Sequence, residues 1–345
     1  MGSINWLMVY IDWLLVHANW LMGYGNRPTP CTFHPTRRSA SVNVRRLDGN
    51  PIIAPALDDR LGENVNGPSL IRAPPWIDDP LGTYYLYFAD HGGTSIRLAY
   101  ADALSGEWTL ADTDPLKLEE AGPGFDAHVA SPDAHVDVAH ERVWVYYHGC
   151  CDRFEDPAGR TDQYTRLALS EDGRNFEARE EALGRFYFRV FEYEDAFYAL
   201  AKENRGSNQE KSGQRVYRSS DGLSGFERGP LLFRNGSRHT AVRVRADTLE
   251  VFYSRIGDAP ERILRSTVDL SPDWMAWTAT DPEPILEPER NWEGADEPVV
   301  PSTAGGVDEP VNQLRDPALY EEGDRTYLLY SVAGESGIAI AELLT

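Results

Sequence analysis

The sequence predicts an all-β protein folded as a five-bladed β-propeller. A unit built around an aromatic strand recurs five times along the chain. The copies follow one another at intervals of roughly 50 to 60 residues, with a longer gap before the last, a period typical of propeller blades. The composition agrees, because 29 Gly, 23 Pro, 9 Trp and 17 Tyr among 345 residues favour many short strands joined by tight turns.

The aromatic strand is the clearest element of the unit. Its five copies, in chain order, read "TYYLYFAD", "RVWVYYHG", "AFYALAKE", "LEVFYSRI" and "TYLLYSVA". Each copy is followed by a loop and a strand of small residues. A sheet of this kind cannot bury both of its faces alone, so neighbouring copies are expected to stack face to face until the ring closes.

A shorter strand precedes each aromatic strand and is expected to be the innermost strand of its blade. The five segments are residues 69–78, 131–138, 186–194, 239–247 and 316–324. Ahead of the first segment, "NPIIAP" at residues 50–55 echoes "EPILEP" at residues 283–288. This similarity predicts that the chain before the first blade supplies a strand that closes the ring.

Two parts are expected, an N-terminal extension over residues 1–40 and a single propeller domain over residues 41–345. In the extension, "NWLMVYI", "DWLLVHA" and "NWLMGYG" follow one another every seven residues. Asp12, His17 and Asn19 interrupt this apolar run, which argues against a membrane span, and the basic region of a signal peptide is absent. We expect the extension to be non-native or loosely docked. Localisation stays open: cytoplasmic, or exported if the true start differs.

The charge and the cysteines exclude some classes of function. The formal net charge is −22, from 55 acidic and 33 basic residues, and the resulting field repels phosphate backbones. Nucleic acid is therefore not an expected partner. Cys31, Cys150 and Cys151 form no even disulfide framework and have no metal-type spacing.

Polar residues recur where the strands of each blade meet the channel. Because adjacent strands run antiparallel, the start of the innermost strand and the end of the next lie at one edge, and these edges ring one mouth of the channel. The stretch "FDAHVASPDAHVD" at residues 125–137 is such an edge. The candidate substrate-binding residues around the mouth are Arg72, His91, His128, His148, Tyr187, Arg189, Glu203, Arg238, Arg255 and Arg315.

Two segments resemble a known superfamily. "SPDAHVDVAHERVWVYYHG" and "LRDPALYEEGDRTYLLYS" are similar to blade openings of the five-bladed propeller glycoside hydrolases, the arabinanase, xylosidase and invertase-like group. The resemblance implies three acidic positions, a base on the first inner strand, a modulating Asp on the second and a Glu acid on the third. Only Asp133, in "SPD", matches, because Gly67 stands at the base position and "GRFYFRV" offers no Glu.

The catalytic hypothesis therefore assigns new residues to the missing roles. Asp316, in the Asp-Pro of "LRDPALY", is expected to serve as the base and His239 as the acid, since an imidazole beside carboxylates can hold a proton near neutral pH. We expect Asp133, Asp316 and His239 to converge with Arg189 and Arg315 on one polar pocket. The predicted reaction is cleavage of a glycosidic bond by a glycoside hydrolase.

The substrate is expected to be an anionic glycan. Arg72, Arg189, Arg238 and Arg315 stand near the openings of four inner strands in an otherwise acidic chain. Arginine forks match carboxylates and sulfates bidentately, so a uronate-containing or sulfated oligosaccharide or polysaccharide fits. The alternative is that these arginines neutralise Asp133, Asp316 and Glu203.

Two other functions remain open. A polysaccharide lyase acts on a uronate by β-elimination with His or Tyr after a cation neutralises the carboxylate, and His128, His239, Tyr187 and the arginines suit that chemistry. A non-catalytic glycan-binding propeller is the other.

No cofactor is expected. His91, His128 and His148 stand on adjacent blade edges, but no local spacing supports a ligand set for a transition metal. The resemblance alone implies that a hydrated calcium ion in the channel, held by a His and waters, is possible.

Overall fold

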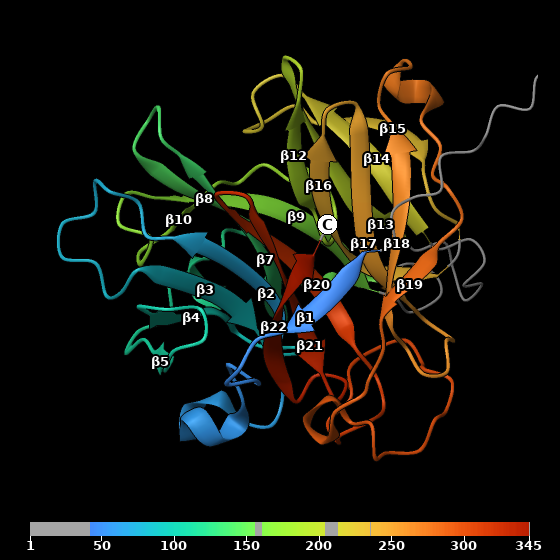
Figure 1. Ribbon diagram of the computed structural model, residues 1–345. Coiled ribbons are helices and arrows are strands. Elements are labelled where there is room, and N and C mark those ends of the chain that lie inside the picture. The colour runs from blue at the N-terminus through green and yellow to red at the C-terminus, as the bar shows by residue number, and fades with distance from the viewer. Residues whose placement is uncertain (1–41, 156–160, 204–212, 235, 345) are drawn as a thin grey trace, which may run out of the picture. The chain divides into compact units, whose positions relative to one another are not determined.

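The computed structural model describes residues 42–155, 161–203, 213–234 and 236–344 (Figure 1). The predicted extension over residues 1–40 lies outside the described residues. Nowhere in the described ranges is there a helix with the length and apolar character needed to cross a membrane.

Five antiparallel sheets form the blades and confirm the predicted fold. Blade 1 contains β2 (Asn66–Arg72), β3 (Tyr84–Ala89), β4 (Ser95–Ala101), β5 (Thr109–Leu110) and β6 (Leu116–Lys117). Blade 2 contains β7 (His128–Asp137), β8 (Arg142–Glu155), β9 (Thr161–Ser170), β10 (Glu177–Ala178) and β11 (Gly184–Arg185). Blade 3 contains β12 (Arg189–Tyr193), β13 (Ala196–Glu203), β14 (Gly213–Ser219) and β15 (Glu227–Leu231).

The remaining sheets complete the ring. Blade 4 contains β16 (Ser237–Arg245), β17 (Thr248–Arg255), β18 (Ile263–Asp269) and β19 (Glu283–Leu286). Blade 5 contains β20 (Arg315–Glu322), β21 (Arg325–Val332), β22 (Gly337–Leu344) and β1 (Asn43–Arg46). The connections carry short 3-10 helices at Pro55–Leu57, Asp59–Leu61, Leu118–Glu120, Trp274–Ala276 and Asn291–Glu293. The predicted aromatic strands are the second strands β3, β8, β13, β17 and β21.

The ring is closed by β1, which pairs antiparallel with β22 from Asn43 opposite Leu344 to Arg46 opposite Ala341 (Figure 1). The prediction that the chain before the first blade supplies the closing strand is confirmed by β1, while "NPIIAP" at residues 50–55 follows this strand and contributes a bridge between Ile53 and Ile338. Proline lacks the N–H that a continuous ladder requires, and this segment has one at each end. The short alternating strand β1 has no such interruption.

Each interface between neighbouring blades has its own apolar core. In β3, Tyr85 and Tyr87 belong to the cluster shared with blade 2, whereas Leu86 and Phe88 belong to the cluster shared with blade 5. Alternate side chains of a strand point to opposite faces, so the continuous aromatic run of each second strand fills two interfaces at once. This double burial explains why the aromatic pattern was visible in the sequence.

The inner strands begin with a repeated irregularity. The register with the second strand shifts between Asn66 and Ser69, between Ala130 and Asp133, between Ser237 and Thr240, and between Arg315 and Ala318. Within three of these bulges Gly67, Ser131 and Asp316 have φ of 62°, 50° and 48°. Each of the three precedes a proline. A bulge re-aims the side chain at its centre, and here it directs the start of each inner strand into the channel.

The buried ion pair that anchors β1 gives a test of ring closure. Arg46 Nε lies 2.7 Å from Glu293 Oε1, with side chains 12% and 0% exposed, while Arg45, 59% exposed, pairs with Glu342 at the surface. We expect Arg46→Met to lower the free energy of unfolding by about 3 kcal/mol, because it leaves a buried carboxylate unpaired. The matched variant Arg45→Met should stay within about 1 kcal/mol of the parent. Urea denaturation measures both, and equal losses would contradict closure through this pair.

Candidate active site

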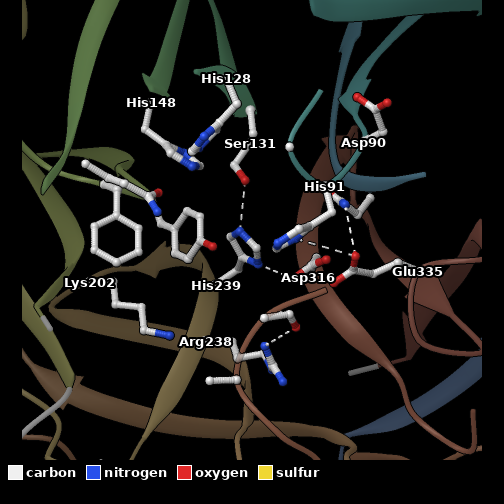
Figure 2. A pocket seen from close by; sticks show the side chains of 18 of the residues that line it. Asp90, His91, His128, Ser131, His148, Lys202, Arg238, His239, Asp316 and Glu335 are labelled. Atoms are coloured by element: carbon white, nitrogen blue, oxygen red, sulfur yellow. Dashed lines mark hydrogen bonds and ion pairs between the residues drawn. The ribbon is translucent and has the colours of Figure 1, made fainter. Parts of the chain in front are cut away.

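A cavity of about 380 Å³ opens where the inner strands begin. Residues from all five blades line it, and Figure 2 shows how their side chains face one another. They are Asn66, Asp90, His91, Gly92, His128, Ala130, Ser131, His148, Gln163, Phe186, Tyr187, Lys202, Arg238, His239, Ile256, Ala304, Gly305, Asp316 and Glu335. Such convergence of polar groups on one concave site is typical of a ligand site.

Three of these side chains form a continuous hydrogen-bonded chain. His239 Nε2 lies 2.9 Å from Ser131 Oγ, and His239 Nδ1 bonds Asp316 Oδ1 (Figure 2). Ser331 Oγ donates to the other oxygen, Asp316 Oδ2, at 3.3 Å. Because an ionised carboxylate only accepts, Nδ1 carries the proton, and Nε2 of the neutral ring accepts from the Ser131 hydroxyl. Asp316 therefore fixes both the tautomer and the orientation of His239.

The electrostatics of this chain favour a neutral imidazole beside an ionised aspartate. Burial lowers the pKa of His239 below its ordinary value, against the opposing effect of Asp316. Burial alone would raise the pKa of Asp316, but His239, Arg315 and Arg238 together hold it well below its usual range. His239 is thus ready to accept a proton at neutral pH.

An aromatic ring and a cation form the next wall. The Tyr187 ring lies against His239 with centroids 3.7 Å apart and against His148 at 4.6 Å. Lys202 Nζ lies 5.8 Å from the Tyr187 centroid. Burial lowers the pKa of Lys202 to about 7, so this side chain gains and loses a proton near neutrality.

Neutral histidines line the blade 2 side. The rings of His128 and His148 meet edge to face with centroids 5.6 Å apart, and His128 Nδ1 lies 3.0 Å from Cys150 Sγ. Burial lowers the pKa of His128 and lowers that of His148 much further. Calcium prefers six to eight oxygen ligands, whereas imidazoles gather here. In the part of the chain that the structure describes, no three His, Cys, Asp or Glu side chains form a metal-ligating group, and a calcium ion held by a single His and waters stays a prediction.

The structure places seven predicted site residues in the cavity wall. They are His91, His128, His148, Tyr187, Arg238, His239 and Asp316. The predicted convergence of His239 with Asp316 is therefore present.

Asp133 and Arg189 do not line this cavity, which corrects the expectation that Asp133 and Asp316 act on one sugar. Asp133 Oδ2 accepts from the Val190 backbone N–H at 2.8 Å and lies 3.0 Å from His135 Nε2. Arg189 Nη1 donates to the Pro132 carbonyl at 3.0 Å. The bulge after Ala130 directs Ser131 into the cavity and Asp133 toward blade 3, so Asp133 and Arg189 join the inner strands of two blades.

Four further predicted residues do not line the cavity and are held in ion pairs. Long charged side chains near a strand end find a partner within their own or a neighbouring blade, an alternative that the sequence left open. The pairs are Arg72 with Glu322, Glu203 with Arg215 and Arg228, Arg255 with Asp258, and Arg315 with Glu335. Arg315 is fully buried and supports Glu335 from behind.

Several lining residues were missing from the predicted set. The sequence could have indicated Ser131, because Ser131-Pro132 stands at the same place in its blade as Asp316-Pro317. Lys202 is the penultimate residue of the second strand of blade 3, a position that the blade pattern also marks. Ala304 and Gly305 come from the insertion before blade 5, which has no repeat pattern to locate them.

Gly67, where the resemblance implies a base, lies directly against Ser131. A Cβ on Gly67 would meet Ser131 Cα at 3.2 Å and Ser131 Oγ at 3.3 Å. A side chain at position 67 would therefore crowd Ser131, which would have to shift by a few tenths of an ångström. The absence of a side chain at position 67 thus leaves room for Ser131.

Comparisons with known proteins identify the fold first. An α-L-arabinofuranosidase from Lactobacillus brevis has a TM-score of 0.61 with 13% identity, covering 86% of this chain and 93% of the other. A thermostable family-43 glycoside hydrolase has a TM-score of 0.58 with 14% identity, covering 86% and 92%. CoXyl43, a β-xylosidase/α-arabinofuranosidase from a compost metagenome in complex with xylotriose, has a TM-score of 0.55 with 13% identity, covering 88% and 95%. The resemblance to five-bladed propeller glycoside hydrolases is thus confirmed for the fold.

A sequence relative then gives the family. The chain is 34% identical over 312 residues to an uncharacterized protein of Acanthamoeba polyphaga mimivirus, covering 81% of this chain and 83% of the viral one. The chain belongs to the family of that protein. No protein-family model matches the sequence.

The contact between Gly67 and Ser131 predicts a stability effect. Gly67→Ala should cost about 1 kcal/mol for the left-handed backbone and about 1 to 3 kcal/mol more for crowding Ser131. Gly225→Ala is the matched control, because Gly225 has φ +60° and a Cβ added there would meet no heavy atom within 4 Å, so only the backbone cost applies. Urea denaturation of both variants isolates the crowding cost. Equal destabilisation would show that position 67 does not press on Ser131.

Proposed function

We propose that this protein is a carbohydrate-active enzyme that cleaves a glycosidic bond at the channel mouth, with His239 as its proton-transfer group. The observation that carries this proposal is a buried, neutral His239, oriented by Asp316, in an open cavity lined by all five blades. The fold that it shares with an arabinofuranosidase and a xylosidase supports a glycan as substrate. Fold likeness alone assigns no chemistry, so the roles follow from the site.

His239 acts as the base in this proposal, and Asp316 positions it. His239 bonds one Asp316 oxygen and Ser331 donates to the other, so we assign Asp316 to orienting the imidazole. His239 Nε2 accepts a proton from a nucleophilic water that displaces the Ser131 hydroxyl from this nitrogen. From the sequence we expected Asp316 to be the base. We now assign it the role of positioning His239.

Lys202 acts as the acid. It is the penultimate residue of β13 in blade 3, the blade on which the resemblance implies the acid, and it lines the cavity. With a pKa of about 7 it holds a proton at neutral pH and releases it readily, as protonation of a leaving glycosidic oxygen requires.

Two cations in the cavity wall support an anionic substrate, although the carboxylates of Asp90, Asp316 and Glu335 also line the cavity. Lys202 and Arg238 line it, and Arg238 is held by Glu261, whose Oε1 lies 2.7 Å from Arg238 Nε. A uronate carboxylate or a sulfate would face these two cations, which supports an anionic glycan. The xylotriose bound by CoXyl43 makes a neutral oligosaccharide the natural comparison.

A second reaction is compatible with the arrangement of Tyr187. Its ring lies against His239, and Lys202 lies over its face. A histidine, a tyrosine and a cation are thus neighbours, and β-elimination on a uronate uses groups of these kinds for proton transfer and for neutralising the carboxylate. A panel of acidic and neutral oligosaccharides, read by mass and by ultraviolet absorbance, separates the two reactions. Paired products that have gained water support hydrolysis, whereas an unsaturated product assigns the lyase. No product from any substrate would overturn the proposal.

The positioning role of Asp316 predicts a kinetic effect. Asp316→Asn should lower kcat by about 10³- to 10⁴-fold with little change in KM, because the amide no longer holds His239 in the productive tautomer. Asp133→Asn is the matched control, since Asp133 is also buried beside a histidine but does not line the cavity, and it should retain activity. Full activity in Asp316→Asn would contradict the role.

The two titrating groups predict a bell-shaped pH profile. His239 must be neutral, so the rate should fall as pH drops through a value below 6.5, whereas Lys202 must be protonated, so the rate should fall as pH rises past about 7. The charged groups facing these two side chains are Asp316, Arg189, Arg238 and Glu261. Lys202→Arg keeps the positive charge and should move the alkaline limb to higher pH. An unchanged alkaline limb in this variant would remove Lys202 from the mechanism.

A further inference from the structure

We propose that the same cavity also hydrolyses acyl esters, with Ser131 as the nucleophile of a Ser131–His239–Asp316 triad. The substrate class is a short acyl ester on a sugar hydroxyl. The sugar rests on the proposed glycan function, whereas the ester chemistry rests on the triad alone.

The triad has the connectivity that nucleophilic catalysis by serine needs. The Ser131 hydroxyl lies 2.9 Å from His239 Nε2, and the opposite ring nitrogen bonds Asp316. The three residues come from blades 2, 4 and 5, so the tertiary fold and not a local turn brings them together. A triad is recognised by such geometry and roles on unrelated folds.

The backbone of Ser131 adopts a strained conformation. Its φ is 50°, a conformation that costs a non-glycine residue on the order of 1 kcal/mol or more. Blade 1 has Gly67 at the same bulge position, where glycine adopts φ 62° freely. A serine here therefore adds a hydroxyl at an energetic cost and directs it into the cavity. A sharp, strained turn at the nucleophile has the same effect in serine hydrolases of other folds.

The oxyanion of an ester intermediate needs a positive partner, and the chain supplies it from a side chain. Pro132 follows Ser131 and has no N–H, so the backbone donor that commonly follows a serine nucleophile is missing. Lys202 is the buried cation on the wall of the same cavity, beside the Tyr187 ring that covers His239. We assign oxyanion stabilisation to its ammonium group.

The reaction balances with water as the second reactant. Ser131 Oγ attacks the ester carbonyl carbon while His239 Nε2 takes the hydroxyl proton. The bond from the acyl carbon to the sugar oxygen then breaks, and His239 returns the proton to that oxygen. Water, deprotonated by His239, attacks the acyl-Ser131 carbon and releases the carboxylic acid and the free serine hydroxyl.

The direct test uses 4-nitrophenyl acetate, an acetylated xylo-oligosaccharide and a fluorophosphonate probe on the full chain. We expect acetate release and one probe adduct per chain, located on Ser131 by peptide mass. Ser131→Ala should abolish the adduct and lower ester turnover by at least about 10³-fold, and His239→Gln should do the same to turnover. Ser69→Ala is the control, because Ser69 lies in β2 of blade 1 outside the cavity and its Oγ accepts from the Ala134 N–H.

A second variant keeps the test valid if Ser131→Ala folds poorly. Ser131→Gly relieves the positive φ, so it should raise the melting temperature while abolishing ester turnover and the adduct. An unlabelled parent chain, or ester turnover in Ser131→Gly equal to that of the parent, would overturn the triad.

The oligosaccharide panel distinguishes this inference from the glycosidic proposal. Ester turnover that depends on Ser131, with no glycosidic cleavage, supports the triad and removes the glycosidase. If the Ser131→Gly chain still cleaves glycosidic bonds and the parent chain shows no ester turnover, the triad proposal is wrong and the glycosidic proposal stands.

Discussion

The closed ring and the channel site depend on one constraint. Each blade buries its two faces only against its neighbours. The second strand of a blade supplies side chains to two interfaces, as Tyr85 and Leu86 do on the two sides of β3. The ring must therefore close, and β1 closes it by pairing with β22. Closure places the starts of five inner strands around one channel, and it is this closure that brings together residues as distant in sequence as Ser131 and Asp316.

The bulges at these strand starts create the candidate active site within the ring. They direct Ser131 and Asp316 into the channel and leave the strands beyond them free to pair regularly. Blade 4 contributes His239 at the corresponding place, between the serine and the aspartate. Burial keeps this histidine neutral, and the Asp316 carboxylate and the Tyr187 ring fix its position, so one residue serves both of the proposed reactions.

The sequence predicted the propeller because aromatic and aliphatic residues at successive positions of a doubly buried strand leave a strong repeated signal. It also predicted His239 and Asp316, which stand at strand starts that the repeat marks. It misplaced Asp133, because a bulge shifts the facing of side chains by one residue and leaves no trace in the pattern of apolar residues. It misplaced Arg315 and Glu203, because the partner that a long charged side chain selects depends on distances that only the closed ring sets.

The central claim is that substrate binds and reacts at His239 in the channel mouth. A crystal structure of the Asp316→Asn chain with a bound oligosaccharide tests it most directly. The account predicts a sugar oxygen or an acyl carbonyl within hydrogen-bonding distance of His239 Nε2 or Ser131 Oγ. A ligand seated instead in the groove between blades 2 and 3, beside His135 and Trp144, with the channel mouth empty of sugar, would contradict it.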